Sequence, residues 1–480
     1  MSDFNSDLNS NLLDSDLGQR QQLERLLQRA ETSAHIEDWF SVVQHLHQGM
    51  LMLDAVLEQE SRTEATPSSA VAEAWERSLD LALRVLDDGE FQDRWDIGNL
   101  LVTLSKLAPH RADAVIQPLM QRLQQSQDAS PDDPQDDTDV QWFAARILGK
   151  FQQPAVLDTL VQVICDSPRD ELTDVAAQAL SGFGESAVAA LAALLRQPKT
   201  RRLATKTLTQ VQHPAAIEPL LSVVDDDDSQ VRAMALSALS RFRDPRVIPL
   251  LLQALQDPAS QVRQTAVADL SAWVGVCTTI DWIGVMQPLL WDSASTVRQQ
   301  AVMTLGRVGT ATAVNELYWA FMQPPQDGVM RVCIVRALGW INTAAALEVL
   351  VALTDPGIEM AQEVLLELIA ALGRVREPRL TLLAFRGLQQ VLTAQDNQGR
   401  SPLIKQAVAQ ELGQLGEPAA LDVLVDLAAD PNMIVKLHAV AALKKLDALV
   451  AHQRLLDLAE DASQSGLVRQ QAAIALQEWC

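Results

Sequence analysis

The chain has 480 residues, of which 38 are Lys or Arg and 62 are Asp or Glu, and its formal net charge is −24 at pH 7. This length predicts more than one ordinary globular core. The low aromatic content of 4%, beside abundant Leu and Ala, favours helices over sheets. No stretch is apolar enough to span a membrane, and the polar, acidic N-terminus is unlike a secretory signal.

Four scattered cysteines without a C-x-x-C pair argue against a disulfide framework or a zinc ribbon; they are Cys165, Cys277, Cys333 and Cys480. This usage fits a reducing compartment. The sequence therefore predicts a soluble, cytoplasmic protein that would associate with a membrane only through a partner.

The first part of the chain divides into three predicted segments. Residues 1–17 resemble a disordered acidic tail, residues 18–125 form an acidic module of amphipathic helices, and residues 126–139 form an acidic linker or loop. Residues 1–139 carry a net charge of −17, against −7 for residues 140–480. Such a module is solvated by default, and a docking surface for a basic partner is the alternative interpretation.

Residues 140–480 contain an internal repeat with leucine anchors that are mostly 31 to 35 residues apart. The anchors are Leu148, Leu180, Leu208, Leu239, Leu270, Leu305, Leu338, Leu372, Leu412, Leu443 and Leu476. Eight copies have alanine four residues before the anchor, and ten have an apolar residue eight before it, which defines one stripe of a helix. A second apolar run precedes each stripe. The pattern predicts an all-α protein, an α-solenoid of about eleven stacked helical hairpins in a right-handed superhelix, with the anchored helices lining its inner side.

A basic residue lies seven positions before the anchor in eight copies: Arg201, Arg232, Arg263, Arg298, Arg331, Lys405, Lys436 and Arg469. Four of these bases have an aspartate six residues earlier, in the turn between the two helices: Asp226, Asp257, Asp292 and Asp430. Such an aspartate can cap the second helix or bond the base of its own or a neighbouring repeat. Nucleic-acid binding would need a net basic surface, so we interpret this ladder as structural and expect no nucleic-acid partner.

The phrase "DSASTVRQQAVMTLGRVG" at residues 292–309 resembles the HEAT-like repeat named after phycobilisome lyases, and the resemblance extends over residues 137–480. It implies a helical-repeat fold. It also implies a cyanobacterial setting, in which relatives attach bilins to phycobiliproteins or assist antenna assembly, while others are non-photosynthetic adaptors. Deoxyhypusine hydroxylase is a similar repeat protein that binds iron through His-Glu dipeptides, but none of the seven histidines here precedes Glu.

No residue pattern supports catalysis, a cofactor or a metal site. The run "VVDDDDSQ" (223–230) lacks the ligand spacing of a calcium loop, and Cys277 has no nearby histidine in the sequence. Tryptophans are more informative. Trp273 and Trp282 occupy slots that predict core positions, whereas Trp142, Trp291 and Trp340 occupy slots where tryptophan is a candidate for binding a partner. Packing under a local loop is the alternative interpretation of these three residues.

Two functions follow as expectations. The first is a non-catalytic scaffold that binds one or more proteins on its concave face, as an assembly factor or chaperone-like adaptor for a photosynthetic antenna or complex. The alternative is a phycocyanobilin lyase, which the resemblance implies. A single tyrosine and the absence of clustered histidines make a tetrapyrrole pocket hard to build, so the sequence favours the scaffold.

Overall fold

The computed structural model describes residues 20–61, 69–107, 111–124, 136–167, 170–323, 327–393, 401–461 and 463–479. Within these ranges all regular structure is helical and no strand occurs, which confirms the predicted all-α class. A helix over residues 20–35 is followed by α2 (Trp39–Ser61), α3 (Ser69–Asp88), α4 (Phe91–Leu107), α5 (Ala112–Gln124), α6 (Asp136–Leu148), α7 (Pro154–Asp166), α8 (Asp170–Ser181), α9 (Glu185–Leu194), α10 (Pro198–Gln210), η3 (Pro214–Ala216), α11 (Ile217–Leu221) and α12 (Ser229–Arg241).

The remaining helices are α13 (Val247–Ala254), α14 (Ser260–Ser271), α15 (Trp282–Met286), η4 (Gln287–Trp291), α16 (Ser295–Val308), α17 (Ala311–Met322), α18 (Gly328–Ile341), α19 (Ala344–Ala352), α20 (Gln362–Gly373), α21 (Thr381–Thr393), α22 (Pro402–Leu415), η5 (Pro418–Ala420), α23 (Leu421–Ala428), α24 (Met433–Glu460) and α25 (Gly466–Gln477).

The chain forms two compact units, Met1–Asp244 and Pro245–Cys480. The first unit contains the helices of the predicted N-terminal module together with four hairpins of the repeat. Helix α6 begins at Asp136, inside the segment predicted as a linker, and it packs on α4 and α5. The predicted tail, residues 1–17, lies outside the described residues.

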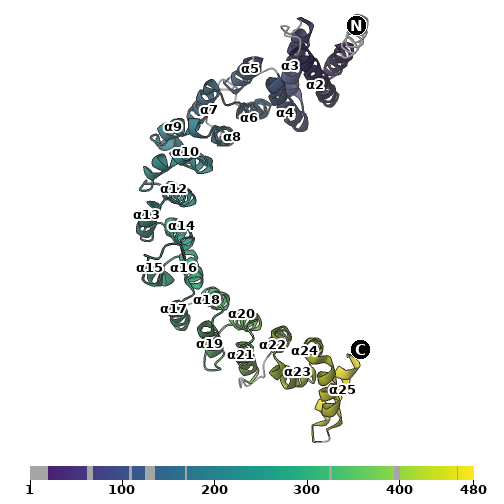
Figure 1. The fold of residues 1–480 in the computed structure, drawn as a ribbon, viewed down its shortest axis with the longest axis vertical. Coiled ribbons are helices and arrows are strands. Elements are labelled where there is room, and N and C mark those ends of the chain that lie inside the picture. Colours follow the sequence, from purple (N-terminus) through teal and green to yellow (C-terminus); the bar gives the residue numbers. More distant parts are fainter. Residues whose placement is uncertain are drawn as a thin grey trace, which may run out of the picture. The chain divides into compact units, whose positions relative to one another are not determined.

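Each hairpin pairs a first helix with a second helix that carries the leucine anchor. In the first unit the anchored helices α6, α8, α10 and α12 pack side by side; in the second unit α14, α16, α18, α20, α22, α24 and α25 do so. We call these helices the second-helix row and their partners the first-helix row. Within each unit, taken by itself, the second-helix row lies on the inner side of the curve that the hairpins follow (Figure 1). The described residues contain eleven hairpins, as predicted, because α24 bends at Asp447 and supplies helices to two of them.

Close approach of neighbouring anchored helices explains the repeated small residues. The eight alanines four residues before the anchors are at most 1% exposed, and ten of the eleven anchor leucines are as fully buried. The exception, Leu476, is only half-buried. Glycine directly after an anchor meets the next helix: a Cβ on Gly413 would lie 2.6 Å from the Cβ of Ala442. The "A-x-x-x-L-G" phrase thus encodes helix-to-helix packing.

Candidate functional site

The basic ladder is bonded inside the protein, beginning with the turn of its own hairpin. The guanidinium of Arg201 donates to the carbonyl of Leu195, six residues earlier, at 2.8 Å. Arg232 and Arg263 make the same bond to the carbonyls of Asp226 (2.7 Å) and Asp257 (2.8 Å). Each base therefore satisfies a turn carbonyl that the helices leave without a partner.

The same bases reach the turn of the following hairpin. Arg201 pairs with Asp226 at 2.8 Å, and Lys405 pairs with Asp430 at 2.7 Å. Arg298 continues the series more loosely, with Asp327 at 3.6 Å. The carboxylate partner thus belongs to the adjacent repeat, and the ladder ties successive repeats together.

The turn aspartates do not cap their helices directly, which corrects one of the two roles that the sequence allowed. Asp257 accepts the backbone N–H of Ala259, and Asp292 accepts that of Ala294, each at 2.8 Å. Each bond closes a two-residue turn immediately before the helix. The N-cap positions themselves are filled by other residues, such as Asn432 before α24.

Arg263 and Asp292 form a bidentate rung. Two guanidinium nitrogens of Arg263 donate to the two carboxylate oxygens of Asp292, both at 2.7 Å, and the side chains are only 12% and 9% exposed. The hydrogen bond from Arg263 holds the pKa of Asp292 below its usual value. A bidentate, largely desolvated pair of this kind is among the stronger side-chain contacts in proteins.

The remaining rungs are less regular. Arg331 donates to the carbonyl of Glu359 at 3.1 Å and lies 5.0 Å from the ring centroid of Phe321. Lys436 is 2% exposed, donates to Gln471 of α25, and has its pKa lowered by burial. Among the described residues, no acceptor lies within hydrogen-bond distance of the buried Nε of Arg469.

Trp142 is half-buried and belongs to an aromatic cluster between α4 and α6. Its ring lies edge-on to Phe143, with centroids 5.0 Å apart, and 6.3 Å from that of Phe91. The guanidinium of Arg146 lies 3.3 Å from the ring centroid of Trp95 and 5.6 Å from that of Trp142. Trp142 therefore has neighbours on α4 and α6, and part of its ring remains exposed.

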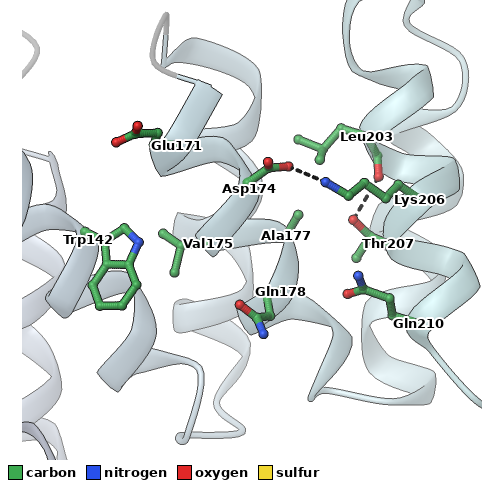
Figure 2. Close-up of a pocket in the computed structure, with 10 residues that line it drawn as sticks. All are labelled: Trp142, Glu171, Asp174, Val175, Ala177, Gln178, Leu203, Lys206, Thr207 and Gln210. Carbon is green, nitrogen blue, oxygen red and sulfur yellow. Dashed lines mark hydrogen bonds and ion pairs between the residues drawn. The ribbon is translucent and has the colours of Figure 1, made fainter.

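A groove on the second-helix row begins at Trp142. It has a volume of about 440 Å³ and runs across α8 to α10, where it is lined by Glu171, Asp174, Val175, Ala177, Gln178, Leu203, Lys206, Thr207 and Gln210. Figure 2 shows Asp174 and Lys206 reaching toward each other between α8 and α10, and their charged atoms are 2.9 Å apart. The groove offers an aromatic edge, an exposed carboxylate at Glu171 and two amide side chains, which suits contact with a polypeptide.

The structure separates the other two candidate tryptophans. Trp340, at the C-terminal end of α18 on the second-helix row, is 58% exposed. Trp291 ends η4 on the first-helix row and lies edge-on to Trp319 of α17, with ring centroids 5.4 Å apart. Their exposed fractions are 37% and 48%. The insertion "PPQDG" at residues 324–328 blurs the repeat register around Trp319, so the repeat pattern does not assign this residue to the core or to the surface.

Two tryptophans expected in the core are only half-buried. They are Trp273, after the end of α14, and Trp282, at the start of α15. The indole N–H of Trp282 donates to the carbonyl of Cys277 at 3.3 Å, across the loop that joins the two helices. In the slot of Trp273, Phe151 and Phe183 are at most 8% exposed, whereas Phe242 is half-buried like Trp273.

An exposed apolar column on the second-helix row was not predicted from the sequence. Nine residues before the anchors stand Val329, Leu403, Ile434 and Leu467, whose side chains are 46–59% exposed. The same slot holds polar or charged residues in the first unit, among them Glu171 and Gln230, and in the other repeats of the second unit, where Gln261, Thr296 and Glu363 occupy it. Leu403, Ile434 and Leu467 thus belong to three consecutive repeats, and Val329 stands two repeats before Leu403. Comparing this slot across repeats would have revealed the column from the sequence.

The described residues contain no group of three or more His, Cys, Asp or Glu side chains placed to hold a metal ion. None of the helices in these ranges is both long and apolar enough to cross a bilayer. Cys165, Cys277 and Cys333 are free thiols.

Comparison with known proteins gives one match to a family model, described as HEAT repeats. It covers residues 132–199, 188–271, 285–370 and 387–477. No curated protein is similar enough in sequence to count as a relative.

Several solved structures resemble the chain at low identity. The structure titled for Kap95p binding to RanGDP is 14% identical, with 95% of this chain and 63% of that chain covered and a TM-score of 0.45. Kap121p bound to Nup53p is 14% identical, with 92% and 57% covered and a TM-score of 0.42. Human deoxyhypusine hydroxylase in complex with glycerol is 20% identical, with 61% and 96% covered and a TM-score of 0.24. The chain thus spans less than two thirds of the Kap95p and Kap121p chains.

Proposed function

Because this chain belongs to the family of HEAT-repeat proteins, we propose that it is a non-catalytic scaffold that binds one or more proteins on its concave face, the second-helix row. Its role is that of an assembly factor or chaperone-like adaptor in the cytoplasm. The resemblance to phycobilisome-lyase repeats makes a photosynthetic antenna or complex the client that we test first.

The observation that carries this proposal is that the charged and the apolar side chains of the second-helix row differ in their contacts. The ladder bases that form ion pairs are bonded to turn carbonyls and aspartates within the protein, as Arg263 is to Asp292. The same helices nevertheless present large apolar side chains to solvent, including Trp340, Ile434 and Leu467 at 55–59% exposure. Apolar side chains that recur on one face are typical of protein-binding surfaces.

The test is affinity capture with the full chain from lysate of its native host. We expect a protein partner in fixed stoichiometry. The triple variant Leu403→Gln, Ile434→Gln, Leu467→Gln should lose that partner, because it makes the apolar column polar. A control with Leu382→Gln and Met322→Gln alters first-helix-row residues of similar exposure, 44% and 41%, and should keep the partner. Equal capture by both variants would contradict the proposal.

A bilin lyase is the second candidate, and the groove at Trp142 is the observation in its favour. Its volume of about 440 Å³ lies within the range of small-molecule sites. Lys206 is the base that would face a bilin propionate, but it already pairs with Asp174, and Glu171 would repel that group. A coloured protein that transfers bilin to a phycobiliprotein would establish the lyase; a colourless protein with a stoichiometric partner supports the scaffold.

A further inference from the structure

The C-terminal ends of three neighbouring helices in the second unit carry an exposed aromatic residue among arginines. Helices α16, α18 and α20 pack in succession. On this surface lie Met303 and Arg307 of α16, Arg336 and Trp340 of α18, and Arg374, which follows α20. We call these five residues the Arg–Trp patch.

Two of the arginines converge on one carboxylate. Arg336 Nη2 lies 2.9 Å from one oxygen of Glu367, and Arg374 Nη2 lies 3.0 Å from the other. Glu367 is 14% exposed, whereas the side chains of Arg336 and Arg374 are 51% and 49% exposed. A guanidinium has five N–H donors, so both arginines keep donors directed to solvent after binding Glu367.

The aromatic residue of the patch lies next to this pair. Gly339 packs against Ala371, and the Arg374 Nη2 atom lies 3.9 Å from the position that a Cβ on Gly339 would take. The next residue is Trp340, at 58% exposure, and Met303 on the adjacent helix is 37% exposed. An apolar platform and two guanidinium groups therefore share one surface.

The local charge is opposite to that of the whole chain. Arg336 and Arg374 contact Glu367, and Arg374 and Arg376 lie near the buried Glu411, so three arginines surround two glutamates. Arg307 and Arg376 spend a donor on backbone carbonyls, those of Ser271 and Gly373 respectively, which fixes them without cancelling their charge. A positive excess persists here although the chain carries −24 overall.

We infer that the Arg–Trp patch binds a segment of a partner protein in which an Asp or Glu side chain lies beside a bulky apolar side chain. The carboxylate takes the free donors of Arg336 and Arg374, and the apolar side chain covers Trp340 and Met303. Arginine beside an exposed tryptophan is the composition of an interface hot spot, and guanidinium–carboxylate pairs add specificity. This inference rests on the proposed scaffold function, since it names the chemistry of one of its binding surfaces.

The experiment titrates the full chain calorimetrically with the acetylated, amidated peptide Gly-Ser-Glu-Leu-Asp-Phe-Glu-Ser-Gly. Its neutral counterpart carries Gln and Asn in place of Glu and Asp. The acidic peptide should bind at least about tenfold more tightly than the neutral one, because charge-assisted hydrogen bonds are lost in the latter. Raising the salt concentration from about 50 to about 300 mM should weaken binding of the acidic peptide, since exposed charges are screened.

Matched variants separate the patch from general charge. The double variant Arg336→Gln, Arg374→Gln should lower the affinity for the acidic peptide about tenfold or more, and so should the single variant Trp340→Leu. Arg386→Gln and Trp319→Leu change an exposed arginine and an exposed tryptophan of the first-helix row and should leave the affinity unchanged. Thermal melting of every variant checks that a loss of binding is not a loss of fold.

Absence of binding by the wild-type chain, or equal binding by the patch variants, overturns the inference. Either result leaves the scaffold proposal to its own test, because capture of the partner is measured with substitutions at Leu403, Ile434 and Leu467. Conversely, peptide binding by a chain that captures no protein would leave the patch chemistry intact and remove the proposed function.

Discussion

At the scale of single residues, the ladder shows how a charged side chain can be structural in a strongly acidic protein. Arg263 bonds two backbone carbonyls of its own turn, at Asp257 and Pro258, and the carboxylate of Asp292 in the next turn. Truncation of Arg263 to alanine removes the donor from all three acceptors. Buried polar groups that lose a partner are costly because they are also shielded from water.

We therefore expect Arg263→Ala to lower the free energy of unfolding by about 1–3 kcal/mol. Denaturant titration at pH 7 measures this loss, with Arg386→Ala as the exposed control. Because Arg263 holds the pKa of Asp292 low, the pair stabilises the fold above the unfolded-state pKa of about 4 and loses that contribution as the pH falls through the folded-state value. The difference between wild type and Arg263→Ala should therefore shrink in acid; a difference that is constant down to pH 2 would contradict the assignment.

Glu411 is expected to behave in the opposite way. It is 9% exposed, it packs against Gly373, and burial raises its pKa despite the nearby Arg374 and Arg376. Its protonated form is favoured in the folded protein, so its contribution to stability is full at low pH and is lost as the pH rises through the folded-state pKa.

Glu411→Gln imitates the protonated form and should raise the melting temperature at pH 7. The gain should disappear below about pH 4, where wild-type Glu411 is itself protonated. Melting curves across this pH range measure the effect. A variant that is less stable than wild type at pH 7 would show that Glu411 is held as a needed anion.

At the scale of elements, the fold depends on how closely the anchored helices approach. The contact between α22 and α24 has no room for a side chain at Gly413, since a Cβ there would lie 2.8 Å from the Cα of Ala442. That neighbour is backbone and cannot rotate away. Glycine at this slot is therefore required by packing, although glycine weakens an isolated helix.

Gly413→Ala should lower the free energy of unfolding by about 1–3 kcal/mol, because overpacking forces the two helices apart. The matched control is Gly328→Ala at the start of α18, where a Cβ meets nothing within 4 Å. There the higher helix propensity of alanine should leave stability equal or slightly raised. Denaturant titration of both variants decides the point, and equal effects would mean that the close contact is not what selects glycine.

At the scale of the whole molecule, the exposed tryptophans distinguish binding from folding. Trp142 is half-buried, and Trp291 and Trp340 are 37% and 58% exposed in the free protein. Trp142→Ala, Trp291→Ala and Trp340→Ala should fold nearly normally, and at least one should weaken capture of the partner by about 2 kcal/mol or more.

Trp273→Ala provides the contrast, because Trp273, which follows the end of α14, is half-buried. It should destabilise the chain, although by less than the roughly 3–5 kcal/mol of a fully buried tryptophan. Denaturant titration of all four variants, followed by capture from host lysate, measures both effects. If all four lose stability equally, the candidate tryptophans are packing residues.

The helical repeat, the eleven hairpins of the described residues and the position of the ladder can be predicted from the sequence, because they follow from a local period of apolar and basic residues. The leucine anchors and the alanines four residues earlier are buried as the period requires. Which atoms the ladder bonds was not decided by that period, since Arg263 reaches a carboxylate 29 residues away.

The exposure of individual side chains and the contacts between side chains of different helices depend on the packed structure. The half-burial of Trp273, the pairing of Trp291 with Trp319 and the meeting of Arg336 and Arg374 on Glu367 depend on loops and on neighbouring helices. A repeat pattern specifies the slot of a residue within its own helix. The surroundings of that slot come from adjacent repeats, whose substitutions and insertions differ from copy to copy. The surface that we propose for binding therefore forms only when the helices are packed.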